Sequence, residues 1–184
     1  MRPIFTATAL LATLTVATVA LAGCSPTVPP HDNGGKIAIV ASTNVWGDLV
    51  KQIGGDAVTV VSIISDSAQD PHSYEANAQV QLALSKADIV IENGGGYDDF
   101  VDTLLKGAGN DSAKLLNAVD ISGFDQGAGL NEHVWYDFPT VRKVAAKIAG
   151  TLSALDASQA SAFEANLKTF DTALSVLESD EAAI

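Results

Sequence analysis

Two histidines stand in short motifs whose residue types could bind a metal ion. The first lies in Asp-Pro-His-Ser-Tyr-Glu (residues 70–75) and the second in Asn-Glu-His-Val-Trp-Tyr-Asp (residues 131–137). Neutral imidazole is the commonest side-chain ligand of zinc, and it also suits manganese and other divalent ions. By spacing alone, His72 and His133 are a weak signal, because two histidines so far apart are more often surface or capping residues.

The residues around the two histidines could orient the imidazoles and shield an ion. Four neighbouring carboxylates could each accept the second ring N–H of an imidazole and fix its tautomer: Asp70, Glu75, Glu132 and Asp137. Pro71 stiffens the backbone before His72, while Trp135 and Tyr136 could form a wall that excludes water. These motifs make His72 and His133 candidate metal ligands, with surface or capping roles as the alternative.

The segments that must position these motifs alternate between strand and helix patterns. Apolar and β-branched runs predict strands at residues 36–41, 58–64, 88–92 and 114–119. Amphipathic patterns predict helices between residues 43 and 54 and at 77–87, 97–108 and 138–155. The alternation predicts an α/β fold with a mostly parallel sheet and helices on both faces. The histidine motifs would lie beyond strand ends, where open α/β sheets bind ligands.

The composition divides the chain into four segments. We expect a signal peptide at residues 1–23, a flexible tether at 24–35, an α/β metal-binding lobe at 36–157 and a long helix at 158–184. In the last segment, apolar residues recur at helical spacing: Phe163, Leu167, Phe170, Leu174 and Leu177. Such a stripe needs a cover, which is either the lobe itself or a second lobe that the sequence does not contain.

The first 24 residues have the composition of a secretory signal. Arg2 is the only charged residue before Asp32, and an apolar run follows it. The run ends in Leu-Ala-Gly-Cys, which resembles a bacterial lipobox, so we expect acylation of Cys24 and a lipid anchor on the extracytoplasmic face of the cell membrane. An uncleaved transmembrane anchor is the alternative. Cys24 is the single cysteine, so no intramolecular disulfide can form.

The charge balance excludes one broad class of function. The chain has 184 residues, with 10 Lys and Arg against 22 Asp and Glu, for a formal net charge of −12. Nucleic-acid binding needs a basic surface, so we expect no nucleic-acid partner. The hydrophobic content of the chain, 47%, is too high for a disordered protein. The excess of acidic residues suits a protein that attracts cations.

Taken whole, the two histidine motifs resemble those of the zinc/manganese solute-binding proteins of ABC uptake transporters (cluster A-I). Residues 39–46 and 92–98 resemble the first strand and helix and the third-strand turn of the same family. The resemblance implies two α/β lobes joined by a long helix, with the metal held between them by two ligands from each lobe. It assigns His72 and His133 to the first lobe. The resemblance assigns the other two ligands to a second lobe, which implies that the sequence stops within the connecting helix.

The resemblance further implies a lipid-anchored, monomeric lipoprotein that captures a divalent transition metal and hands it to an ABC permease. A lipoprotein of this kind performs no covalent chemistry, so we expect no enzymatic activity. Zinc is the favoured cargo and manganese the alternative, although the histidine-rich loop of some zinc-type members is missing between residues 72 and 133.

Three other functions fit parts of the sequence. A zinc-dependent hydrolase could use His72 and His133 as ligands and Glu75 as general base, but the first motif lies on a polar loop and not on a helix. The glycines after Asn93 are typical of a phosphate-binding turn, although Asp98 and Asp99 would repel a phosphate. A lipid-anchored adhesin is the third possibility, and no motif selects it.

Overall fold

A computed structural model of the chain describes residues 34–75, 77–127 and 129–183. The chain divides into two units, Met1–Pro30 and His31–Ile184, and all described residues belong to the second unit. The predicted signal peptide, the predicted lipidation site Cys24 and most of the predicted tether therefore lie outside the described residues. Within these residues, no helix combines the length and apolar character needed to cross a bilayer.

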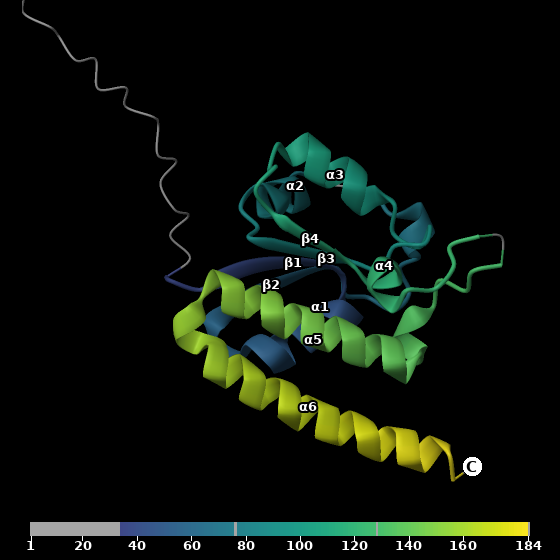
Figure 1. Cartoon of the computed structure of the whole chain (residues 1–184). Coiled ribbons are helices and arrows are strands. Elements are labelled where there is room, and N and C mark those ends of the chain that lie inside the picture. Colours follow the sequence, from purple (N-terminus) through teal and green to yellow (C-terminus); the bar gives the residue numbers. More distant parts are fainter. Residues whose placement is uncertain (1–33, 76, 128, 184) are drawn as a thin grey trace, which may run out of the picture. The chain divides into compact units, whose positions relative to one another are not determined.

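Four parallel strands form one sheet in the order β2-β1-β3-β4 (Figure 1). Their bounds are β1 (Ile37–Thr43), β2 (Val58–Ile64), β3 (Ile89–Glu92) and β4 (Lys114–Asn117). The two central strands, β1 and β3, are buried almost throughout, as expected for a sheet covered on both faces. The chain leaves β1 to one side for β2 and later pairs β3 on the other side, so the switch in strand order lies between β1 and β3.

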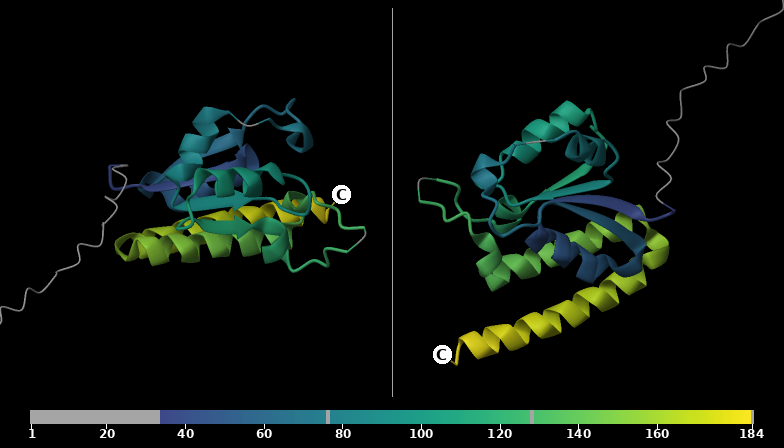
Figure 2. Two further views of the ribbon diagram at one scale, coloured as in Figure 1. Left: turned by 90° about the horizontal axis from the view of Figure 1, so that it is seen from above. Right: turned by 180° about the vertical axis from the view of Figure 1, so that it is seen from behind.

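Helices cover both faces of this sheet, which confirms the predicted α/β architecture. On one face, α2 (Ala78–Ser85) and α3 (Phe100–Ala108) pack over Val40 and Val90. The opposite face carries α1 (Asn44–Gly54), α4 (Ala118–Ser122), α5 (Phe138–Leu155) and α6 (Ala160–Glu181). In both views of Figure 2, α6 runs beside α5, and it contacts both α5 and α1.

Side-chain caps fix where several elements begin and end. Asp137 accepts the backbone N–H of Thr140 at 2.8 Å, so α5 starts at residue 138, as predicted. Asn117 accepts the N–H of Asp120 at 2.9 Å and starts α4, which ends β4 two residues before the predicted strand end. The predicted start of α3 at residue 97 is also wrong, because residues 94–97 form a turn.

The long C-terminal helix packs against the lobe along most of its predicted apolar stripe. Phe163 is fully buried and Leu174 is 5% exposed, while Leu167 and Phe170 are half-buried against the same core. Leu177 is 55% exposed. The lobe itself therefore covers the first four positions of the stripe and leaves the last one open.

Candidate metal centre

Both candidate histidines lie on loops at the carboxyl end of the sheet. His72 is in the one-turn helix Pro71–Ser73, which follows β2. His133 immediately precedes the one-turn helix Val134–Tyr136, which leads into α5. Asn93, directly after β3, hydrogen-bonds the backbone beside His133, so this loop reaches back to the strand end.

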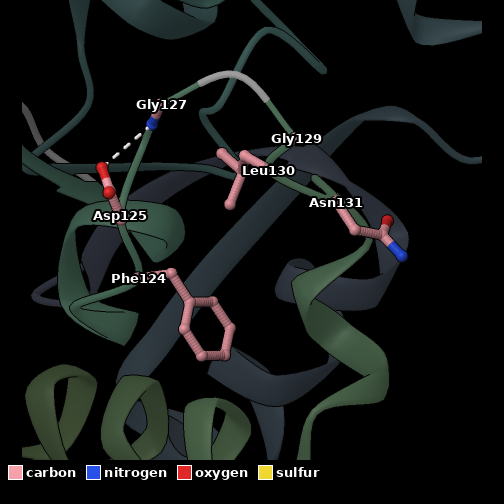
Figure 3. A pocket seen from close by; sticks show the side chains of 6 residues that line it. All are labelled: Phe124, Asp125, Gly127, Gly129, Leu130 and Asn131. Atoms are coloured by element: carbon pink, nitrogen blue, oxygen red, sulfur yellow. Dashed lines mark hydrogen bonds between the residues drawn. The ribbon is translucent and has the colours of Figure 1, made fainter.

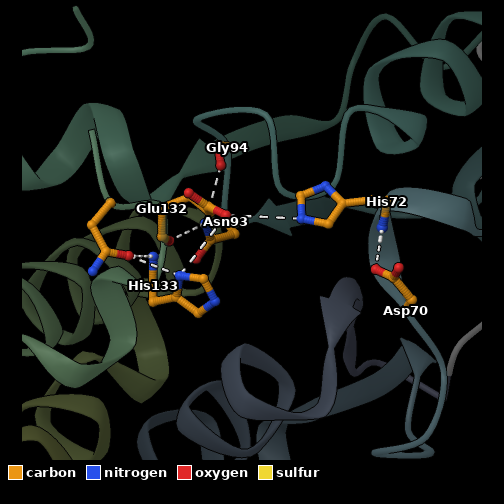
Figure 4. A network of polar contacts seen from close by, with 7 residues as sticks. Asp70, His72, Asn93, Gly94, Glu132 and His133 are labelled. Carbon is orange, nitrogen blue, oxygen red and sulfur yellow. Dashed lines mark hydrogen bonds and ion pairs between the residues drawn. The ribbon is translucent and has the colours of Figure 1, made fainter. Parts of the chain in front are cut away.

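Asp70 orients the backbone at His72 rather than its ring. The Oδ1 atom of Asp70 accepts the backbone N–H of His72 at 3.0 Å and caps the short turn (Figure 4). Pro71 occupies the first position of that turn, where its missing N–H costs nothing. The expectation that Asp70 bonds an imidazole N–H is thus replaced by a role in shaping the loop.

A single carboxylate lies between the two imidazoles (Figure 4). The Oε1 atom of Glu132 is 3.8 Å from Nε2 of His72 and 3.8 Å from Nδ1 of His133. The two ring nitrogens are therefore at most twice that distance apart. These separations are too long for hydrogen bonds. Among the described residues, no three His, Cys, Asp or Glu side chains form a group tight enough to hold an ion.

The His133 ring is oriented by an amide that the sequence analysis did not select. Nδ1 of His133 is 2.8 Å from Oδ1 of Asn131, and an amide oxygen can only accept, so Nδ1 carries the proton. Nε2 then keeps its lone pair and can bind a metal. Asn131 also accepts the backbone N–H of His133 at 3.1 Å. The residue that fixes the tautomer is therefore Asn131 and not one of the flanking carboxylates.

Tyr97 forms the aromatic centre of the site. Its ring centroid lies 5.4 Å from that of His72, 5.8 Å from that of His133 and 4.9 Å from that of Trp135. Burial, aided by nearby acids, raises the pKa of its phenol, so Tyr97 stays neutral at physiological pH. Tyr97 was not among the predicted site residues, although its place after three glycines at a strand end was an available signal.

The remaining predicted residues divide into those near the imidazoles and those that serve other roles. Trp135 stacks at a tilt beside His133, with centroids 5.1 Å apart, and it also contacts Tyr136, which is 76% exposed. Asp137 uses its carboxylate to cap α5 and not to contact a histidine ring. Glu75 is exposed, and no hydrogen bond or ion pair joins it to the two histidines in the described part of the chain.

The backbone of the glycine turn after β3 is hydrogen-bonded to the nearby carboxylate of Asp98. Asp98, 1% exposed, accepts the N–H of Asn93 at 2.7 Å and that of Gly94 at 2.8 Å. Burial raises the pKa of Asp98, and these two hydrogen bonds act in the opposite direction. Two of the backbone N–H groups at this turn are thus already bound by a carboxylate and are not free for a phosphate. Gly94 has φ 77°, and a Cβ there would overlap the side chain of Asn117.

A pocket of about 400 Å³ lies in the loop that leads to the second motif (Figure 3). Phe124, Leu130 and Asn131 contribute to its lining, and Asp125 turns back to accept the N–H of Gly127 at 3.1 Å. Neither histidine lines this pocket. It is therefore a neighbour of the candidate metal centre and not a part of it.

The fold and this geometry define an α/β lobe with a candidate cation site between two loops at the carboxyl end of a parallel sheet. The family model described as zinc-uptake complex component A, periplasmic (ZnuA) matches residues 39–184. The match covers more than half of the chain, which belongs to this family. The resemblance drawn from the histidine motifs is thereby confirmed.

Curated relatives are named as metal-binding transport proteins. The metal ABC transporter substrate-binding lipoprotein ScbA of Streptococcus cristatus is 29% identical over 182 residues, covering 92% of this chain and 58% of the relative. The manganese-binding lipoprotein MntA of Halalkalibacterium halodurans is 27% identical over 159 residues, covering 85% and 53%. The chain thus spans less than two thirds of the length of these relatives. Their names denote substrate or metal binding and not catalysis.

Solved structures share the fold. The Mn-bound periplasmic metal-binding protein of Candidatus Liberibacter asiaticus has a TM-score of 0.64 at 23% identity, covering 73% of this chain and 52% of its own. Zn(II)-bound AdcA of Streptococcus pneumoniae has a TM-score of 0.66 at 23% identity, covering 79% and 32%. At such identities these likenesses show the fold alone.

Proposed function

We propose that the chain is the N-terminal, metal-binding lobe of a lipoprotein that captures a divalent transition metal outside the membrane and delivers it to an ABC permease. Family membership supports a role in metal uptake. The observation that carries the proposal is the convergence of the two histidine loops, where the Glu132 carboxylate lies 3.8 Å from Nε2 of His72 and 3.8 Å from the protonated Nδ1 of His133.

The chemistry of this arrangement suits a captured cation. His72 and His133 supply neutral nitrogen ligands from two loops, and Glu132 adds a negative charge between them. Tyr97 and Trp135 flank the imidazoles with apolar ring surface, while the His72 and His133 side chains remain 49% and 46% exposed. No covalent step is needed, because the metal is cargo that is bound and released.

Zinc is our favoured cargo, with manganese as the alternative. Two imidazoles favour zinc, whereas a carboxylate contribution from Glu132 also suits manganese. The names of the relatives include both metals.

We further propose how the chain is placed in the cell. Acylated Cys24 anchors it to the extracytoplasmic face of the membrane, and residues 24–35 serve as a tether. Residues 158–184 begin a helix between two lobes, the second of which contributes the remaining two ligands. The protein acts as a monomer, with the permease as its partner.

Metal titration of this chain tests the proposal. Zn²⁺ and Mn²⁺ are added in separate runs in competition with a chromophoric chelator, and His72→Ala and His133→Ala are each expected to weaken binding at least tenfold. His31→Ala is the matched control, because it removes the third histidine of the chain from outside the predicted lobe. Unchanged affinity in both site variants, or equal loss in the control, contradicts the assignment. Binding should also weaken on acidification, since protonated imidazole cannot bind a metal.

A further inference from the structure

A buried asparagine at the end of β3 holds the loop that carries His133. Asn93 is fully buried, and its Nδ2 donates to the carbonyl oxygen of Glu132 at 2.8 Å and to that of Gly94 at 3.0 Å (Figure 4). The same Glu132 carbonyl accepts the N–H of Val134 at 2.8 Å. The peptide group between Glu132 and His133 is thus held from the strand end and from within its own loop.

The backbone of Asn93 also forms hydrogen bonds with two other segments, the glycine turn and α4. Its N–H is bound by Asp98 at 2.7 Å, and its carbonyl accepts the N–H of Val119, in α4, at 2.9 Å. Four hydrogen bonds therefore connect residue 93 to the glycine turn, to α4 and to the second histidine loop. Because β3 is a fully buried central strand, this anchor is rigid.

The orientation of the Asn93 amide has only one consistent assignment. Both carbonyl partners can only accept, so the amide nitrogen must face them. The Oδ1 atom is then buried without a hydrogen-bond partner among the described residues. The two hydrogen bonds that the amide donates hold the carbonyl groups of Gly94 and Glu132 in place.

We propose that Asn93 is a positioning residue for metal binding, which fixes the peptide between Glu132 and His133 before the metal arrives. This inference rests on the proposed function. Asn93 is not itself a ligand. It reduces the conformational freedom that the His133 loop would otherwise lose on binding, and so it raises affinity by preorganisation.

The chain contains a matched control for this residue. Asn110 also donates from Nδ2 to two carbonyl oxygens, those of Leu84 and Ala87, each at 2.8 Å. These bonds link the segments around α2 and α3, and among the described residues no hydrogen bond joins Leu84 or Ala87 to His72 or His133. Asn93→Ala and Asn110→Ala thus each remove two hydrogen bonds from an amide nitrogen to backbone carbonyl groups. Only the bonds of Asn93 hold the loop that carries His133.

The experiment compares both variants with the wild-type chain in two measurements. Chelator competition with Zn²⁺ and Mn²⁺, under conditions where each protein is folded, should show a loss of about 10- to 100-fold for Asn93→Ala and less than twofold for Asn110→Ala. Hydrogen exchange without metal should show faster exchange at residues 131–134 in Asn93→Ala only. Asn93→Asp, which sets a carboxylate against two carbonyls, should bind as weakly as the alanine variant.

Each outcome supports or overturns the inference. If the wild-type chain binds metal and Asn93→Ala binds equally well, the positioning role is wrong while the proposed function stands. If His72→Ala binds metal as tightly as the wild-type chain, the proposed function fails and the inference fails with it. Should Asn93→Ala not fold, Asn93→Ser replaces it, because a shorter hydroxyl donor preserves part of the bonding to Gly94 but cannot span to Glu132. Full affinity in that variant would also overturn the inference.

Discussion

Arg142 of α5 and Glu178 of α6 form a two-pronged ion pair. Nη1 lies 3.0 Å from Oε1, and Nη2 lies 3.0 Å from Oε2. Asp171 and Ser175, about two turns and one turn earlier on α6, also face the guanidinium, at 3.7 Å and 3.2 Å. One arginine therefore holds the last third of α6 against α5, in the region where Leu177 leaves the apolar stripe uncovered.

The ion pair of Arg142 and Glu178 should hold α6 locally against α5 without contributing much to the global stability of the lobe. Arg142→Ala should accelerate hydrogen exchange at residues 172–181, with little change in Tm, because a pair that is one-third exposed is screened by solvent. The hydrogen bond from Arg142 lowers the pKa of Glu178, so the stabilisation is present above the ordinary carboxyl pKa of 4.5 and is lost as pH falls through the lowered value. Lys168→Ala, an exposed cation on the same helix, should leave the exchange rates unchanged.

Two apolar residues of α6 should differ sharply in their contribution to stability. Phe163→Ala removes a fully buried ring from the core and should lower the free energy of unfolding by about 3–5 kcal/mol. Leu177→Ala changes a side chain that is 55% exposed, so a shift of about 0.5 kcal/mol or less is expected. Urea denaturation of both variants checks this. Equal effects would mean that α6 does not belong to the folded lobe.

Glu92 should make the lobe less stable as pH rises. Burial raises its pKa from 4.5 to about 7, and the hydrogen bond from Asn117 only partly offsets this. The folded state then holds a proton that the unfolded state has lost, so stability falls between about pH 4.5 and 7 by roughly 2–3 kcal/mol. Glu92→Gln should abolish this loss and be more stable than wild type at pH 8.

Denaturation series at several pH values provide the measurement. The two proteins should converge near pH 4, where Glu92 is protonated in both folded and unfolded states. Asp102→Asn serves as control, because Asp102 is an exposed carboxylate that adds only a minor contribution to the pKa of Glu92. A wild-type curve parallel to that of Glu92→Gln over the whole range would refute the prediction.

Asn131 should affect metal affinity through the tautomer of His133. Asn131→Ala removes the acceptor 2.8 Å from Nδ1, so the ring loses its orientation and binding should weaken about tenfold. Asn131→Asp keeps an acceptor at that position and should bind at least as tightly as wild type. Competition titrations with Zn²⁺ compare the two variants, and equal behaviour of both would exclude this role.

The main elements could be predicted because their patterns are local. β2 and α5 have the predicted bounds, since a β-branched run and an apolar stripe each describe their own environment. The errors arose where a side chain from a neighbouring segment intervenes. Asn117 ends β4 by capping α4, and Asp98 folds the glycine turn that delays α3, and neither role is visible in a periodic pattern.

The candidate site was less predictable than the fold. The histidines could be selected because their residue type has a known chemistry, whereas Asn93, Tyr97 and Asn131 carry no such mark. Their roles come from contacts with the histidine rings or their loops, which form only in the folded chain. Asp137 shows the converse, because a carboxylate near a histidine in the sequence serves the start of α5 instead.

The sequence alone determined the α/β class, the family and the two histidines of interest, because hydropathy periods and motif chemistry need no knowledge of distant residues. The tertiary structure decided which groups surround those histidines. Residues 93 and 132 are hydrogen-bonded although 39 positions separate them, and that contact depends on strand order and loop path together. Orientation within a site is a property of converging segments, so it emerges only when the chain has folded.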